Sequence, residues 1–169
     1  VHCLAALAPV AALTGEAERA RRLAAQAVAD ARRFRLRRIL VMTLVRAAET
    51  AVLTADQETA RDLVRELLCT LADIGTQRWV ADAIELAAVI LERAGQPQPA
   101  ARLLGACGAI HSSLGEPAGG LRGLAETVDA SHDRLAELLG AKALAEQEAL
   151  GAGLSTDQAI PYALEWLET

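Results

Sequence analysis

The sequence predicts an all-α protein built from stacked helix pairs, and three observations predict this fold class. Small residues recur every 40 positions, at a turn and again five residues later: Gly15, Ala55 and Gly95, then Ala20, Ala60 and Ala100. Hydrophobic residues make up 53% of the chain but aromatic residues only 2%, because alanine and leucine, both strong helix formers, supply most of the apolar content. The apolar positions between the turns recur with helical spacing. Since 40 residues accommodate two helices and their turns, we expect antiparallel helix pairs stacked in one array.

Glycines and capping residues divide the first 115 residues into six expected helices. Gly15 and Gly75 end helices, because glycine readily adopts the backbone conformation that follows a last turn. Asp56 is a good N-cap, as is Thr54, and Pro97 suits the first turn of a helix. The expected helices pair in chain order and cover 1–13, 16–33, 36–53, 57–74, 76–94 and 97–114.

The repeat fails after residue 115. Residues 115–120 combine glycines with a proline, which predicts a loop. Beyond it, leucines at helical spacing predict helices over 121–139 and 141–150, and a capping box predicts a last helix from Ser155 to about residue 168. We therefore expect three repeat pairs over 1–115 and capping helices of the same domain over 116–169.

Two prolines lie inside expected helices. Pro9 falls in the first helix and Pro161 in the last, where each removes a backbone hydrogen bond and crowds the preceding turn. We expect a kink or an early stop at both.

Composition and charge exclude some classes of partner. The net charge is −5 and the pI about 5.2, so we do not expect this chain itself to bind nucleic acid. The longest uncharged apolar run, residues 1–13, is too short to cross a bilayer and follows no basic segment, so we expect no membrane partner and no export signal. The cysteines, Cys3, Cys69 and Cys107, fall inside expected helices, which predicts reduced thiols in a cytoplasmic protein.

The repeated positions resemble the packing positions of the tetratricopeptide motif. Smaller residues stand where that motif usually has tryptophan and tyrosine, so the chain is similar to a degenerate relative with a longer period. The resemblance implies a right-handed superhelical stack of antiparallel helix pairs. The residues that carry it are Leu4, Leu7, Ala8, Ala11, Gly15, Ala20, Ala24 and Ala27 in the first pair, Leu44, Ala47, Ala48, Ala51, Ala60 and Val64 in the second, and Ile84, Ala87, Ala88, Leu91, Gly95, Ala100 and Leu104 in the third.

The C-terminal third resembles the end of large bacterial regulators. Those proteins combine a signal-transduction ATPase module and a tetratricopeptide-like sensor region with a LuxR-type or winged-helix DNA-binding domain, or with a nucleotide cyclase domain. The resemblance implies a non-catalytic binding or sensor segment of a transcriptional or signalling regulator. The segments that carry it are 100–106, 114–117, 139–140, 154–155 and 162–164, together with Ala159.

No nucleotide-binding motif is present in the sequence. The G-x-x-x-x-G-K-[ST] pattern does not occur, and Lys142 is the only lysine. Any ATPase or DNA-binding activity would therefore belong to other domains. The chain does not begin with methionine, which predicts that it is a piece of a longer protein. We expect no cofactor.

Cys107 and His111 form the one pair with the spacing of a metal half-site. Residues four apart share a helix face, and cysteine and histidine are both zinc ligands. The sequence offers no further ligands beside them, so we expect no metal and interpret Cys107 as a core residue. Nucleophilic catalysis would need a lowered thiol pKa and a third group that orients the histidine. Neither is visible, and we expect no enzyme activity.

The segment 32–38 is the densest cluster of charge. Its arginines fall at the expected turn between the second and third helices. One interpretation is a docking site for an acidic partner, and the other is a solvated turn whose arginines pair with nearby acids. Both interpretations remain open at the level of sequence.

The expected concave face gives candidate partner-binding residues. In tetratricopeptide arrays the first helix of each pair lines this face, so the resemblance implies protein or peptide contacts, or contacts with other domains of the same chain. An extended segment with apolar anchors and a lysine or arginine would complement this mixture of apolar and acidic side chains. The candidate residues are Met42, Val45, Glu49, Val52, Asp82, Glu85, Val89 and Glu92.

Two alternative functions remain. The segment could be a structural scaffold that spaces or dimerises a parent protein, which makes a homodimer the partner. It could also be a small all-α enzyme, although no paired acidic motifs facing a cavity are recognisable in the sequence.

Overall fold

A computed structural model describes residues 1–35, 37–74, 77–115 and 122–168. This part of the chain is helical and contains no strand, which confirms the all-α prediction. No helix in it is both long and apolar enough to span a membrane. The loop predicted over 115–120 lies, apart from Gly115, outside the described residues. The helices are α1 (His2–Leu13), α2 (Ala17–Phe34), α3 (Arg37–Leu53), α4 (Gln57–Ile74), α5 (Gln77–Arg93), α6 (Pro97–Leu114), α7 (Ala125–Leu139), α8 (Ala141–Ala152) and α9 (Thr156–Leu167), with a short 3₁₀ turn, η1 (Arg122–Leu124), before α7.

The turns inside the three helix pairs are the same structure repeated at 40-residue intervals. Gly15, Ala55 and Gly95 all adopt positive φ, at 83°, 56° and 75°. After each of them a backbone N–H donates to a carbonyl five residues earlier, at 2.9 Å in all three pairs: Glu16 to Ala11, Asp56 to Ala51 and Gln96 to Leu91. These are Schellman turns, which satisfy the last carbonyls of a helix. The sequence period is therefore a structural period.

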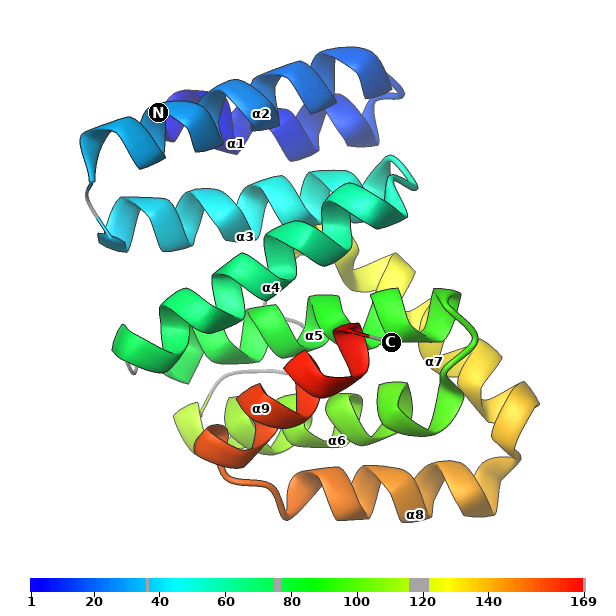
Figure 1. Ribbon diagram of the computed structural model, residues 1–169. Helices are drawn as coiled ribbons and strands as arrows, with labels where there is room; N and C mark the ends of the chain where they lie inside the picture. Colours follow the sequence, from blue (N-terminus) through cyan, green and yellow to red (C-terminus); the bar gives the residue numbers. More distant parts are fainter. Residues whose placement is uncertain (36, 75–76, 116–121, 169) are drawn as a thin grey trace.

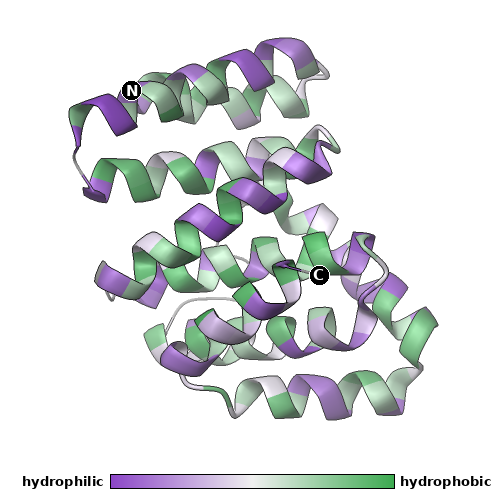
Figure 2. Cartoon of the chain, in the orientation of Figure 1, coloured by the Kyte–Doolittle hydropathy of each residue, from purple (hydrophilic) through white to green (hydrophobic). Residues whose placement is uncertain are grey.

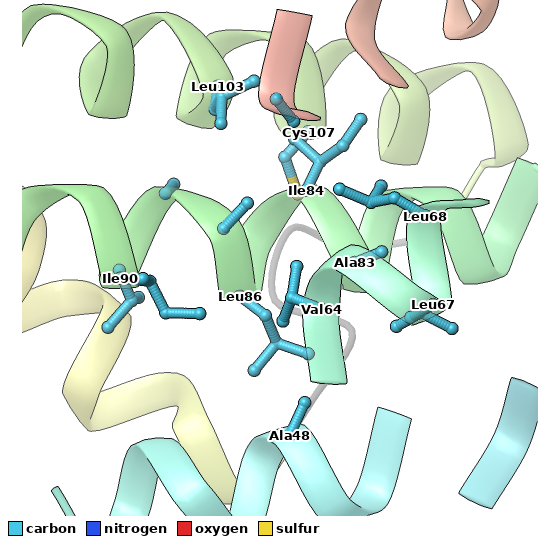
Figure 3. Packing of buried hydrophobic residues seen from close by; sticks show 14 of the residues in the cluster. Ala48, Val64, Leu67, Leu68, Ala83, Ile84, Leu86, Ile90, Leu103 and Cys107 are labelled. Carbon is cyan, nitrogen blue, oxygen red and sulfur yellow. The ribbon is translucent and has the colours of Figure 1, made fainter. Parts of the chain in front are cut away.

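The pairs lie one below the other (Figure 1). The helices α1 and α2 both pack on α3, which packs in turn on α4 and α5, and α5 packs on α6. Ala20, Ala60 and Ala100, which follow the repeated turns, are fully buried, as close helix contact requires. Figure 3 shows the centre of this core, where Val64 and Leu67 of α4, Ile84 and Leu86 of α5, and Cys107 of α6 lie together.

The C-terminal helices surround the last pair. The helix α8 runs beside α6, while α7 returns to α5 and η1 reaches α1 and α3. The helix α9 crosses α4, α5 and α6. Its predicted capping box is confirmed, with the Ser155 N–H donating to Oε1 of Gln158 at 3.0 Å.

Of the two outcomes predicted at the prolines, a kink or an early stop, the early stop occurs at neither. The helix α1 continues past Pro9 to Leu13, and α9 continues past Pro161 to Leu167. Both helices bury apolar residues before and after the proline, such as Ala8 and Ala11 around Pro9. This tertiary packing outweighs one lost hydrogen bond in each helix.

Candidate functional site

The predicted concave face is occupied by the chain's own C-terminal part. Met42 is half-buried, and the other seven candidate residues are buried: Val45, Glu49, Val52, Asp82, Glu85, Val89 and Glu92. The segment from η1 into α7 lies against α3 and α5, where the sequence predicts an open groove. The sequence predicts that these residues form an exposed face, whereas the seven are buried. At Glu49 and Glu92 the covering residues come from η1 and α7, which return along the array.

Glu92 is the strongest polar link between this face and α7. Its carboxylate accepts two hydrogen bonds from the Arg134 guanidinium, both at 2.7 Å, and one from the Ser131 hydroxyl at 3.2 Å. The Arg134 hydrogen bonds hold the pKa of the Glu92 carboxyl below its ordinary value, although burial acts in the opposite direction. The acidic side chain that suggested a ligand site is thus engaged within the chain.

Glu49 is covered in a similar way by η1. Nη1 of Arg46 donates to its carboxylate at 2.7 Å. A Cβ added to Gly123 of η1 would lie 2.5 Å from Oε1 of Glu49, so a side chain at this position would have to displace the Glu49 carboxylate. No room for a peptide ligand remains at this position.

A second group of polar side chains is buried between α5 and α6. One carboxylate oxygen of Glu85, Sγ of Cys107 and one ring nitrogen of His111 all lie within 4.8 Å of one another, and all three residues are buried. We refer to them as the Glu85–Cys107–His111 cluster. Burial, together with the nearby carboxylates of Glu85 and Asp82, raises the pKa of the Cys107 thiol. This thiol lies 3.6 Å from the Ala81 carbonyl, within reach of a weak S–H···O hydrogen bond.

The cluster forms one wall of a cavity of about 340 Å³. Residues of α7 and α8 also line it, among them Asp129, His132 and Glu148. Nε2 of His132 lies 3.0 Å from Oε1 of Glu148, and both side chains are partly exposed, which places this pair at the solvent side of the cavity. The sequence identified the Cys107–His111 spacing but not Glu85, which approaches from a different helix.

The arginine segment 32–38 is tied in part to α4. Arg32 pairs with Glu66 through two hydrogen bonds, and Arg37 pairs with Asp73 at 2.6 Å. Leu36, within the segment, lies outside the described residues. For these two arginines, the geometry is that of the solvated turn with local acidic partners.

The helix α1 carries an open apolar face that the sequence did not single out. Leu7 and Val10 are 49% and 53% exposed, and Cys3 is exposed one turn earlier on the same side. No residue of α1 is a carboxylate, lysine or arginine, and Figure 2 shows hydrophobic colour along α1 where α2 carries long hydrophilic stretches. We call Cys3, Leu7 and Val10 the open α1 face.

The 40-residue repeat identifies which positions of α3 and α5 correspond to the open α1 face. The positions equivalent to Leu7 are Ala47 and Ala87, those equivalent to Val10 are Thr50 and Ile90, and those equivalent to Cys3 are Thr43 and Ala83. All six are at most 3% exposed. In α3 and α5 this side is covered, whereas α1 leaves it exposed.

Comparison with protein-family models, curated proteins and solved structures gave no match.

Proposed function

We propose that this chain is a tetratricopeptide-like, right-handed helical-repeat segment whose function is to bind protein, and that the open α1 face is the surface it uses. The single observation that carries the proposal is the contrast in burial between Leu7 and Val10 and their buried equivalents in α3 and α5. The resemblance of the C-terminal third to bacterial regulators implies that such a segment belongs to a signalling or transcriptional regulator, where it would make contacts between proteins or between domains. This function requires no cofactor and no catalytic residue.

The proposed occupant is an antiparallel helix pair of the same kind. Within the chain, the pair α1–α2 packs on α3 and the pair α3–α4 packs on α5, so the open face would continue an interface that already exists twice in the fold. Burying the exposed parts of Leu7 and Val10 would contribute on the order of 1 kcal/mol each. A helix that is apolar on several sides is usually buried, as α3 and α5 are in this fold.

The experiment extends the array by one pair. A second copy of residues 37–80 is placed directly before Val1. Because Val1 is equivalent to Ala81, which follows Val80 in the chain, this junction keeps the register of the repeat. We expect the copied pair to fold on the open α1 face, to raise the helical circular dichroism by about two helices, and to unfold with the rest in one transition at a higher temperature. A copy that stays unfolded, or unfolds separately from the rest, would contradict the proposal.

Matched variants show whether the open α1 face is responsible. Leu7→Glu with Val10→Glu should uncouple the copied pair from the array, because two carboxylates would be buried without partners. Leu138→Glu is the control, since Leu138 is 64% exposed on α7 and should leave the coupling intact. Light scattering of the unextended chain distinguishes the alternative: a mass of two chains that Leu7→Glu with Val10→Glu reduces to one would identify a second copy as the occupant.

A further inference from the structure

We propose that the Glu85–Cys107–His111 cluster is a binding site for one divalent transition metal ion of the zinc type, with the fourth coordination position directed toward the cavity. The sequence alone predicts no metal, because it shows only two ligands. The fold supplies the third ligand from α5, and the inference is independent of the proposed binding function.

The donor set matches the metal. Thiolate, imidazole and carboxylate are the three ligand types that zinc takes in proteins, with bonds of about 2.0–2.3 Å. Ligand atoms joined by such bonds in a tetrahedron are separated by about 3.4–3.7 Å. The cluster atoms lie within 4.8 Å of one another, so a contraction of about 1 Å would bring them to this geometry. Thiolate and imidazole ligands disfavour magnesium and calcium, which prefer oxygen.

The elements that carry the ligands hold them in a fixed arrangement. Cys107 and His111 are one turn apart on α6, and α5 packs on α6 along its length. All three residues are buried within the hydrophobic core, so their side chains have little freedom to turn away from each other. A site formed on two packed helices is more rigid than a site formed on loops.

The cavity provides both an entry path and the open coordination position. It has a volume of about 340 Å³, which accommodates a hydrated ion. Asp129, His132 and Glu148 also line it, and the two carboxylates in this lining attract a cation. Three protein ligands with an accessible fourth position is the arrangement of zinc sites that bind water or a small ligand, as distinct from closed structural sites.

The experiment titrates the full chain with cobalt(II), a spectroscopic substitute for zinc, after treatment with a chelator under reducing conditions. We expect one equivalent to bind, with thiolate-to-cobalt charge-transfer absorption, and zinc to displace it. Zinc should also raise the thermal unfolding midpoint of the unsubstituted chain, because an ion that binds only the folded state stabilises it. The absence of both stoichiometric absorption and a zinc-dependent midpoint would overturn the proposal and leave a buried polar cluster without a metal.

Variants assign the ligands. Cys107→Ser, His111→Gln and Glu85→Gln should each weaken cobalt binding at least about tenfold, and Cys107→Ser should also remove the charge-transfer band. Cys3→Ser and Cys69→Ser are the matched controls, since both cysteines are exposed and lie outside the cluster. Circular dichroism checks that each variant folds. A band that survives Cys107→Ser in a folded protein, or that is lost in the Cys69→Ser control, would contradict the assignment.

Discussion

Arg134 and Glu92 join α7 to α5 through a partly desolvated ion pair. The Glu92 side chain is 6% exposed and that of Arg134 is 44% exposed, so the carboxylate is the member of the pair that depends on its partner. Without Arg134, the buried Glu92 carboxylate would keep only one of these three hydrogen bonds, the one from the Ser131 hydroxyl. The cost of an uncompensated buried charge exceeds what a surface pair contributes.

We expect Arg134→Ala to lower the free energy of unfolding by about 1–3 kcal/mol at pH 7, less than for a fully buried pair because Arg134 is half-exposed. Since the folded pKa of Glu92 lies below its ordinary 4.5, the pair stabilises the fold fully above that pH and loses this contribution as the pH falls through the folded pKa. Urea unfolding of both proteins at several pH values measures the difference, which should shrink as the pH falls below 4.5.

The control for this prediction is Arg65→Ala. Arg65 pairs with Glu168 at 3.2 Å and is 42% exposed, much as Arg134 is, but Glu168 is 63% exposed whereas Glu92 is buried. We expect a change of less than about 0.5 kcal/mol. Equal losses in the two variants, or a loss in Arg134→Ala that does not depend on pH, would show that Glu92 does not need its partner.

At the residue scale, the sequence identified the important acids but not their environments. Glu49, Glu85 and Glu92 were singled out by helical position, and each has a specific structural role. The contacts of Glu49 and Glu92 with η1 and α7 join residues about 40 to 75 positions apart, and such long-range placement leaves no local pattern in the sequence. Glu85 could have been joined to Cys107 and His111 only by knowing how α5 and α6 align.

The contact between α6 and α8 depends on two glycines. A Cβ added to Gly105 would lie 2.0 Å from the Glu148 carbonyl oxygen, and one added to Gly151 would lie 1.8 Å from the Arg102 carbonyl oxygen. Both neighbouring atoms are backbone, which cannot move without shifting a helix. The two helices therefore touch backbone to backbone at two points.

We expect Gly105→Ala and Gly151→Ala each to destabilise the fold by about 1–3 kcal/mol or more, although alanine is the better helix former. Gly108→Ala is the matched control on α6, because a Cβ there meets nothing within 4 Å. It should be neutral or stabilising by up to about 1 kcal/mol. Thermal or denaturant unfolding of the three variants gives the comparison, and the same sign of change in all three would contradict the close contact.

At the element scale, helix boundaries were the most predictable feature. Gly15 and Gly95, the Asp56 cap and the Ser155 capping box act through local backbone hydrogen bonds, so the sequence around them is sufficient. The expected helix 97–114 agrees with α6 at both ends. The helices do not stop at the two prolines, because the local cost of each proline is outweighed by packing that the sequence of a single helix does not reveal.

The arrangement of the whole molecule follows from one repeated turn and one departure from it. Three identical Schellman turns produce three helix pairs, and the array then returns on itself, so that η1 and α7 cover the α3 and α5 side. The period could be read from the sequence because glycine and alanine recur at fixed spacing. The return of η1 and α7 along the array could not be read from the sequence, because it has no counterpart in the earlier repeats and lies beyond residues 116–121.

The most direct test of the central claim is the reactivity of Cys3 in the chain extended by a copy of residues 37–80, with the copied Cys69 replaced by serine. Cys3 belongs to the open α1 face, and its equivalents Thr43 and Ala83 are buried by the neighbouring pair. Cys69 is exposed on α4 and is the internal reference. Alkylation followed by mass spectrometry should show Cys3 and Cys69 reacting readily in the original chain, and Cys3 protected at least about tenfold in the extended chain while Cys69 is unchanged. Equal reactivity of Cys3 in the two proteins would contradict the claim that this face receives a further helix pair.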